Sequence, residues 1–195
     1  TFQIKSQVMT KQTNIIGLVG PTQSGKSVVA SILRDTYGLR LAPIAGPLKQ
    51  MLIAGGLEYS EVYGDNKERP SALLGGRTPR HAMQTLGTEW GRELIHPDLW
   101  LNMWVTAYDK LGGGVPRTVQ PVVVDDVRFE NEAAAIRERG GIIVEICRPS
   151  AKYSTEHPSE NGVCRIDDRI HNTGDLTHLR RQVADLMAGL VVARV

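Results

Sequence analysis

The order of apolar segments along the 195-residue chain predicts an α/β fold, a mostly parallel sheet with helices on both faces. Three observations support it. Short apolar runs are typical of strands buried on both faces, helical periodicity follows most of them, and Gly and Pro residues separate the two kinds of segment. A chain of this length builds one well-buried domain more readily than two, so we expect a single domain over residues 1–195.

The expected elements alternate along the sequence. The first dozen residues are polar and without periodicity, and residues 58–79 combine turn residues with charge, which predicts a surface segment with no strong element of its own. Strands are expected at 14–19, 39–45, 121–126, 142–147 and 165–170, and helices at 28–37, 48–53, 80–86, 97–108, 131–139 and 176–190.

Composition limits the functional classes. The chain is 41% hydrophobic and 23% charged with a net charge of +2, so we expect no stable binding to nucleic acid. No run approaches the ~18 apolar residues of a membrane span, and no signal peptide is recognised near the start, so we expect no membrane association. The two cysteines, Cys147 and Cys164, are interpreted as reduced thiols of a cytoplasmic protein, and a structural metal is not expected.

One motif carries strong chemical information. The segment Gly20-Pro21-Thr22-Gln23-Ser24-Gly25-Lys26-Ser27 matches the Walker A pattern at every fixed position, with a strand before it and a helix after it. Its glycines let successive amides face one anion, and the positive end of the following helix dipole faces the same phosphates. Lys26 is expected to reach the β- and γ-phosphates. The predicted ATP-binding residues from this segment are Gly20, Gln23, Ser24, Gly25, Lys26, Ser27 and Val28.

A second motif predicts a metal site. Asp125 and Asp126 end the apolar run 121–126, where a Walker A protein places the acidic partner of Mg²⁺. We predict that Ser27 and Asp125 hold the ion. Asp125 and Asp126 lie on opposite sides of the strand, and the alternation does not say which of them faces the metal. A helix cap or a solvated turn is the alternative interpretation.

The type of P-loop protein follows from what accompanies the motif. No Asn-Lys-x-Asp segment for guanine is present, and the short chain with a basic middle segment favours a kinase for a small phosphorylated acceptor. These features predict a three-layer P-loop kinase fold with a mostly parallel five-stranded sheet. An acceptor-binding segment is expected at about 46–110 and a lid-like segment at about 148–165.

Several segments resemble the bacteriophage deoxynucleoside monophosphate kinases. Arg80-His81-Ala82-Met83-Gln84-Thr85-Leu86-Gly87-Thr88 is similar to their Arg-x-x-x-Gln-x-Leu-Gly-Thr block, and this is the most specific match. Four further segments are similar and occur in the same order along the chain. One precedes this block, 45–49, and three follow it: Asp126-Val127-Arg128 with Glu132, 157–160 and 172–176. Together they run from about residue 16 to 180. The resemblance implies transfer of the γ-phosphate of ATP to a deoxynucleoside monophosphate (dNMP), with Mg²⁺, in the cytoplasm, or in the host cytoplasm if the chain is phage-encoded.

The resemblance also implies residue roles. Lys26, Arg128 and Asp126 would be catalytic, and Asn172 would lie near the donor base. The acceptor would contact Arg80, Gln84 and Arg128. Lys49, Arg77 and Trp90 are further acceptor candidates from their chemistry alone, since cationic side chains match phosphate oxygens and an indole can stack on a base. For several of these a solvated surface position is the alternative. Trp100 and Trp104, four residues apart, are interpreted as a core-facing stripe.

Two other functions stay open at this stage. A dephospho-coenzyme A kinase shares the expected fold but not the Gln84 to Thr88 block. A nucleotide-dependent ATPase or binding module would turn over ATP without an acceptor. The sequence is compatible with a homodimer.

Overall fold

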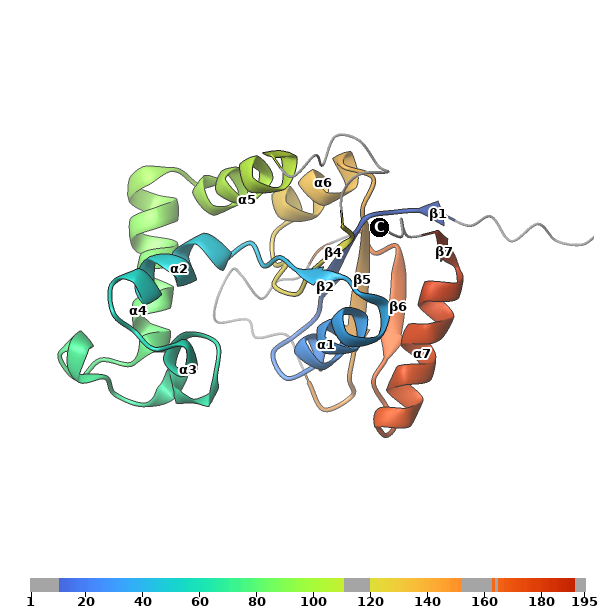
Figure 1. The fold of residues 1–195 in the computed structure, drawn as a ribbon, viewed down its shortest axis with the longest axis horizontal. Coiled ribbons are helices and arrows are strands. Elements are labelled where there is room, and N and C mark those ends of the chain that lie inside the picture. Colours follow the sequence, from blue (N-terminus) through green and yellow to red (C-terminus); the bar gives the residue numbers. More distant parts are fainter. Residues whose placement is uncertain (1–10, 111–119, 152–162, 164, 192–195) are drawn as a thin grey trace, which may run out of the picture. The chain divides into compact units, whose positions relative to one another are not determined.

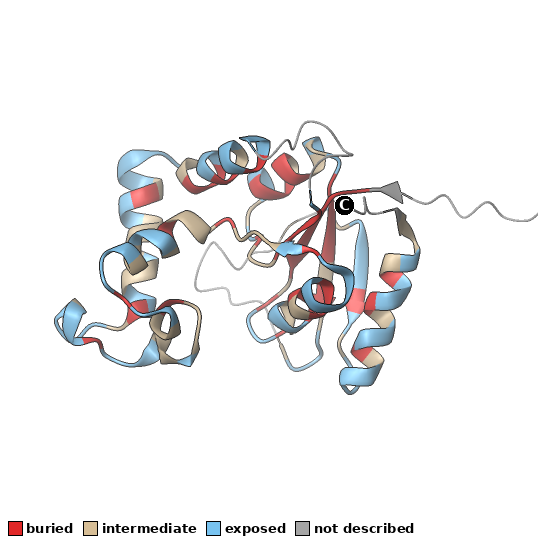
Figure 2. Cartoon of the chain, viewed as in Figure 1, coloured by how far each residue is buried: buried red, intermediate tan, exposed pale blue. Residues whose placement is uncertain are grey.

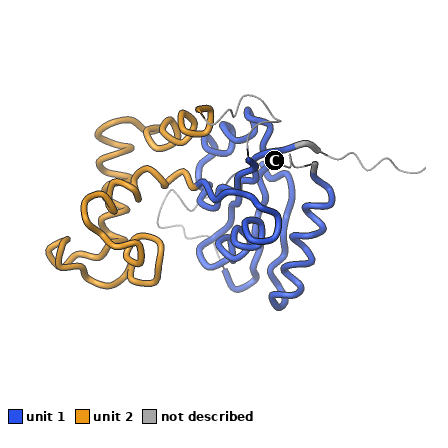
Figure 3. The backbone as a smooth tube through the Cα atoms, in the orientation of Figure 1, with its two compact units in different colours: residues 1–42, 111–195 blue, residues 43–110 orange. Residues whose placement is uncertain are grey.

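The structure, a computed structural model, describes residues 11–110, 120–151, 163 and 165–191. It divides into two compact units, one formed by residues 1–42 and 111–195 and the other by Pro43–Lys110 (Figure 3). Each unit is described in turn. Cys164 and most of the predicted lid lie outside the described residues.

The first unit contains a five-stranded sheet (Figure 1). Its strands are β2 (Ile15–Val19), β3 (Arg40–Leu41), β4 (Val122–Val124), β5 (Ile142–Cys147) and β6 (Asp168–His171). Their order in the sheet is β3-β4-β2-β5-β6, and every pair is parallel. The prediction of a mostly parallel five-stranded sheet is therefore confirmed. β2 occupies the centre, so the loop that follows it begins at the carboxyl edge of the sheet.

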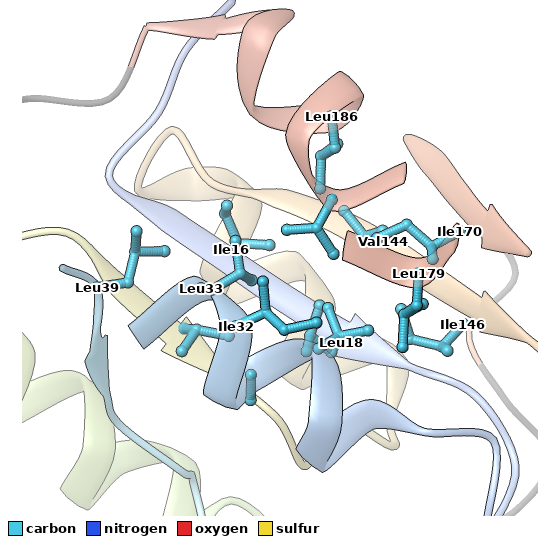
Figure 4. Packing of buried hydrophobic residues seen from close by; sticks show 14 of the residues in the cluster. Ile16, Leu18, Ile32, Leu33, Leu39, Val144, Ile146, Ile170, Leu179 and Leu186 are labelled. Carbon is cyan, nitrogen blue, oxygen red and sulfur yellow. The ribbon is translucent and has the colours of Figure 1, made fainter. Parts of the chain in front are cut away.

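Helices cover both faces of this sheet. Helices α1 (Lys26–Tyr37) and α7 (Leu176–Ala188) pack against each other and over the face that carries Ile16 and Leu18 (Figure 4). Helix α6 (Glu130–Glu138) covers the other face, where a Cβ at Gly17 would lie 3.0 Å from the Ile136 side chain. Alternate residues of β2 thus face different helices, and all five are buried (Figure 2). This two-sided burial explains why the strand reads as a continuous apolar run.

Of the five predicted strands, β5 has the predicted bounds, and the other four are shorter or shifted. β3 has only two residues and β6 begins at Asp168, and both are edge strands that pair on one side alone. The polar beginning of the chain contains β1 (Lys11–Gln12), which pairs in parallel with β7 (Leu190–Val191). The first dozen residues show no periodicity that would predict β1, because a two-residue strand is formed by a distant partner and leaves no local pattern.

The second unit is helical. Its regular helices are α2 (Gly46–Ala54), α3 (Tyr59–Val62), α4 (Pro79–Thr85) and α5 (Leu99–Lys110), with 3-10 turns at Asp65–Glu68 and Ala72–Leu74. Residues 58–79, predicted to have no strong element of their own, thus contain only short helical turns before α4 begins. α3 begins with a reciprocal cap, in which Glu61 accepts from the Glu58 amide at 2.8 Å. This cap stabilises a helix too short to show periodicity.

A ten-residue π-helix, Leu86–Ile95, continues directly from α4. Such long π segments are rare and need a specific reason. Trp100 of α5 supplies one, because its indole Nε1 donates to the Gly87 carbonyl at 2.8 Å and its ring lies directly on Gly91. Trp100 and Trp104 are buried, as predicted. Among the described residues no helix is both long enough and apolar enough to cross a bilayer.

Candidate active site

The Walker A segment forms a tight loop between β2 and α1. Three of its residues have positive φ angles: Gly20 at 140°, Gln23 at 65° and Gly25 at 107°. The helix begins at Lys26, and the Gly25 carbonyl accepts its first bonds from the amides of Val28 and Val29, both at 3.0 Å. These angles turn the loop back over the N-terminus of α1, where amides and helix dipole both favour an anion.

Gly20 has no room for a side chain. A Cβ there would lie 2.7 Å from the Ile146 carbonyl oxygen and 2.9 Å from the Ser24 hydroxyl. Ser24 itself is fully buried. Its amide donates to the Pro21 carbonyl at 3.2 Å and its carbonyl accepts from Asn172 at 2.9 Å, so the structure presents no exposed Ser24 atom for the predicted ATP contact.

Lys26 is held across the loop. Its ammonium group donates to the carbonyl of Gly20 at 2.6 Å and to that of Pro21 at 2.9 Å. These bonds fix a positive charge beside the amides at the start of α1. Ser27 and Val28, the next two residues, are exposed at the same end of the helix.

Side chains from β5 and β6 reach carbonyls of the loop. Asn172 follows β6 directly, and its side-chain amide donates to the Ser24 carbonyl at 2.9 Å. Arg148 follows β5, and its guanidinium donates to the Gln23 carbonyl at 3.3 Å. The sequence suggested a donor-base contact for Asn172 and no specific partner for Arg148. Both contacts depend on the ends of neighbouring parallel strands meeting at one edge.

The end of β4 carries the predicted acidic residues. Asp125 and Asp126 are half-buried, and Arg128 is exposed. Glu132, which is 2% exposed, accepts from the backbone amides of Arg128 at 2.8 Å and of Phe129 at 3.1 Å. Glu132 thus fixes the turn that presents Arg128. Glu132 lies three residues after the N-cap residue Phe129, the position from which a glutamate side chain bonds back to the N-cap amide.

The oxygen groups at this edge fit a magnesium ion. Val124 pairs with Gly17 in the sheet, so Asp125 extends along β4 beside the last part of β2, which leads into the P-loop. A hydroxyl and a carboxylate are the hard donors that Mg²⁺ binds, and the ion usually keeps places for phosphate oxygens and water. Among the described residues no group of three or more His, Cys, Asp or Glu side chains could hold a metal by itself.

The other predicted acceptor residues lie in the helical unit. The Arg80 guanidinium pairs with Glu68, and the Lys49 ammonium lies 4.7 Å from the centre of the Tyr63 ring. Arg77 and Gln84 are exposed. Trp90 is 37% exposed, and its ring centre is 6.0 Å from that of Trp100.

Cys147 is the one predicted thiol among the described residues, at the end of β5. Burial, with the nearby Glu145 carboxylate, raises the pKa of this thiol above its ordinary value. The thiol therefore stays protonated at neutral pH, which makes it a poor nucleophile.

The loop, its lysine and the sheet order define the class of protein. A central strand followed by a complete Walker A loop, in a parallel sheet of order β3-β4-β2-β5-β6, is the architecture of P-loop kinases. Among solved structures, a dephospho-CoA kinase from Campylobacter jejuni matches with a TM-score of 0.43 at 14% identity, over 91% of this chain and 96% of that one.

Sequence comparisons identify the family. The model of the deoxynucleotide monophosphate kinase family matches residues 77–183. A protein of Acanthamoeba polyphaga mimivirus named "Putative deoxynucleotide monophosphate kinase" is 35% identical over 75% of this chain and 80% of its own length. A deoxynucleoside-5'-monophosphate kinase of Escherichia phage T5 is 32% identical over 44% of this chain and 35% of its own length. The chain belongs to the deoxynucleotide monophosphate kinase family and is a nucleoside monophosphate kinase, as the resemblance predicted.

Proposed function

We propose that this enzyme transfers the γ-phosphate of ATP to a dNMP and releases ADP and a deoxynucleoside diphosphate. The observation that carries the proposal is the P-loop of a family member with its lysine in place. Lys26 bonds the Gly20 and Pro21 carbonyls at the N-terminus of α1, a position suited to a triphosphate.

Each group of the P-loop has a distinct part in the proposed reaction. The loop amides hold the donor phosphates, and Lys26 balances the charge that develops on the oxygens of the transferring group. We assign Ser27 and Asp125 to Mg²⁺, which when bound neutralises charge on the β- and γ-phosphates. The acceptor phosphate is already an anion and attacks the γ-phosphorus in line, so no strong general base is required.

The residues proposed to bind the acceptor follow β4 or belong to the helical unit. We assign Arg128 to the acceptor or transferring phosphate, because the buried Glu132 fixes its backbone and a guanidinium matches phosphate oxygens. Asp126 is proposed to orient the acceptor. We assign Lys49, Arg77, Arg80, Gln84 and Trp90 of the helical unit to binding the acceptor nucleotide. Arg80 pairs with an exposed carboxylate, Glu68, which an acceptor phosphate could displace at little cost.

The test is a coupled assay of ADP release. The purified enzyme is given ATP and Mg²⁺ with each of the four dNMPs, with dephospho-coenzyme A, or with no acceptor. We expect at least one dNMP to raise the rate well above the ATP-only rate, and Lys26→Ala to remove that rate. Lys110→Ala, at the end of α5, is the matched control and should keep it.

Other outcomes would point to the alternatives. If dephospho-coenzyme A alone raised the rate of ADP release, it would be the acceptor instead of a dNMP. An ATP-only rate that DNA raises and no small acceptor changes would favour a nucleotide-dependent ATPase. Size-exclusion chromatography with light scattering on the same sample measures whether the enzyme is a homodimer.

A further inference from the structure

Four carbonyls of the P-loop accept hydrogen bonds from side chains. Lys26 donates to those of Gly20 and Pro21, Arg148 to that of Gln23, and Asn172 to that of Ser24. In a planar trans peptide unit the carbonyl and the following amide point in opposite directions. A donor that holds the Ser24 carbonyl therefore directs the Gly25 amide to the other side of the loop, where the phosphates are proposed to bind.

Asn172 is well placed for this task because its own backbone is fixed. Its amide nitrogen donates to the Cys147 carbonyl at 2.8 Å, which extends the β5–β6 pairing by one step. The side chain then lies directly against the loop. A Cβ at Gly25 would be 2.5 Å from the Asn172 side-chain nitrogen. Gly25 is therefore required both by its φ of 107° and by the approach of Asn172.

We infer that Asn172 is a positioning residue that binds the Ser24–Gly25 peptide unit and sets the P-loop for the triphosphate, without reading the donor base. The inference rests on the proposed function in so far as the donor is a nucleoside triphosphate. It replaces the expectation that residue 172 passes near the base. The two roles make different predictions about donors that differ only in the base.

The test compares the binding of three Mg²⁺-loaded donors by calorimetry: ATP, GTP and inorganic tripolyphosphate. The proteins are the wild type, Asn172→Ala, Asn172→Asp and the adjacent control Thr173→Ala, whose side chain is exposed. We expect Asn172→Ala to raise the Kd by about three- to tenfold for all three donors, the value of one ordinary hydrogen bond. Asn172→Asp should lose more donor affinity than Asn172→Ala, because its carboxylate turns an acceptor toward the Ser24 carbonyl. Thr173→Ala should bind like the wild type.

A loss confined to ATP, or an unchanged Kd, would overturn the inference. A wild type that binds donors but phosphorylates no dNMP would refute the proposed acceptor and leave the inference standing. A wild type that binds no triphosphate would refute both. Thermal unfolding of each variant distinguishes a loss of stability from a loss of donor affinity, because lower stability alone leaves the Kd of the folded protein unchanged.

A double-mutant cycle provides a second test. Gly25→Ala places a methyl group where the Asn172 side chain lies, and Asn172→Ala removes that conflict but not the strain of a positive φ. The loss of tripolyphosphate affinity caused by Gly25→Ala should therefore be smaller in the Asn172→Ala background. Strictly additive losses would contradict a direct action of Asn172 on this peptide unit.

Discussion

Gly91 in the π-helix offers a quantitative test of how the second unit is held together. A Cβ there would lie 2.4 Å from Nε1 and 2.6 Å from two ring carbons of Trp100. The indole is rigid, buried and bonded to the Gly87 carbonyl at 2.8 Å, so it cannot move aside without losing that bond. Gly91→Ala therefore forces the ring out of place.

The expected effect combines three contributions. Overpacking of a filled core costs about 1–3 kcal/mol, and the lost indole hydrogen bond adds about 1 kcal/mol. Replacing Gly by Ala inside a helix returns up to about 1 kcal/mol. We expect Gly91→Ala to lower the free energy of unfolding by about 1–3 kcal/mol.

Gly87→Ala is the matched control in the same π-helix. Its Cβ would meet Leu48 at 3.5 Å, an ordinary contact, and its carbonyl would still accept the indole bond. This variant should be as stable as the wild type or up to about 1 kcal/mol more stable. The assay is equilibrium urea unfolding followed by tryptophan fluorescence, since Trp90, Trp100 and Trp104 all belong to this unit. A Gly91→Ala variant as stable as the wild type would refute the reasoning.

Four further predictions concern the proposed site. Glu132→Ala leaves two backbone amides without their acceptor, so urea unfolding should show a free energy of unfolding lower by about 2–4 kcal/mol. The control Glu138→Ala, at an exposed position, should change it by less than about 0.5 kcal/mol. Equal losses in the two variants would contradict the role of Glu132. Gly20→Ala should weaken ATP binding at least tenfold in calorimetry, because its side chain meets the Ile146 carbonyl and its φ is positive; wild-type affinity would show that the loop adapts. Ser24→Ala should keep the ATP Kd within about twofold, because a fully buried hydroxyl reaches no phosphate, and a large loss of affinity would place that hydroxyl in the site. EDTA should abolish phosphate transfer but leave the melting temperature of the ligand-free protein unchanged, and a lower melting temperature would indicate a structural metal instead.

Much of the fold could be predicted from the sequence because its elements carry local patterns. β2 and β4 are continuous apolar runs, since a parallel strand in the middle of the sheet is buried on both faces. The P-loop is recognisable because each fixed residue of its pattern answers a local need: positive φ at two glycines, a charge at Lys26 and a hydroxyl at Ser27. Gly38, with a φ of 75°, ends α1 as a C-terminal glycine should. Such features depend on a few neighbouring residues.

The remaining features depend on residues that are distant along the chain. The β1–β7 pair joins both ends of the described chain, and no local pattern marks a strand of two residues. In the π-helix Gly91 lies against Trp100 of α5, and the sequence that continues from α4 carries no local pattern that predicts a π-helix. The contact of Asn172 with the P-loop could not be predicted for the same reason, because only the parallel arrangement of β5 and β6 brings its amide to Ser24, 148 residues away along the chain. The sequence by itself thus determined the sheet and the phosphate-binding loop, where the chemistry is local, and the tertiary structure decided which side chains support that loop, because hydrogen bonds between distant residues form only once the strands are aligned.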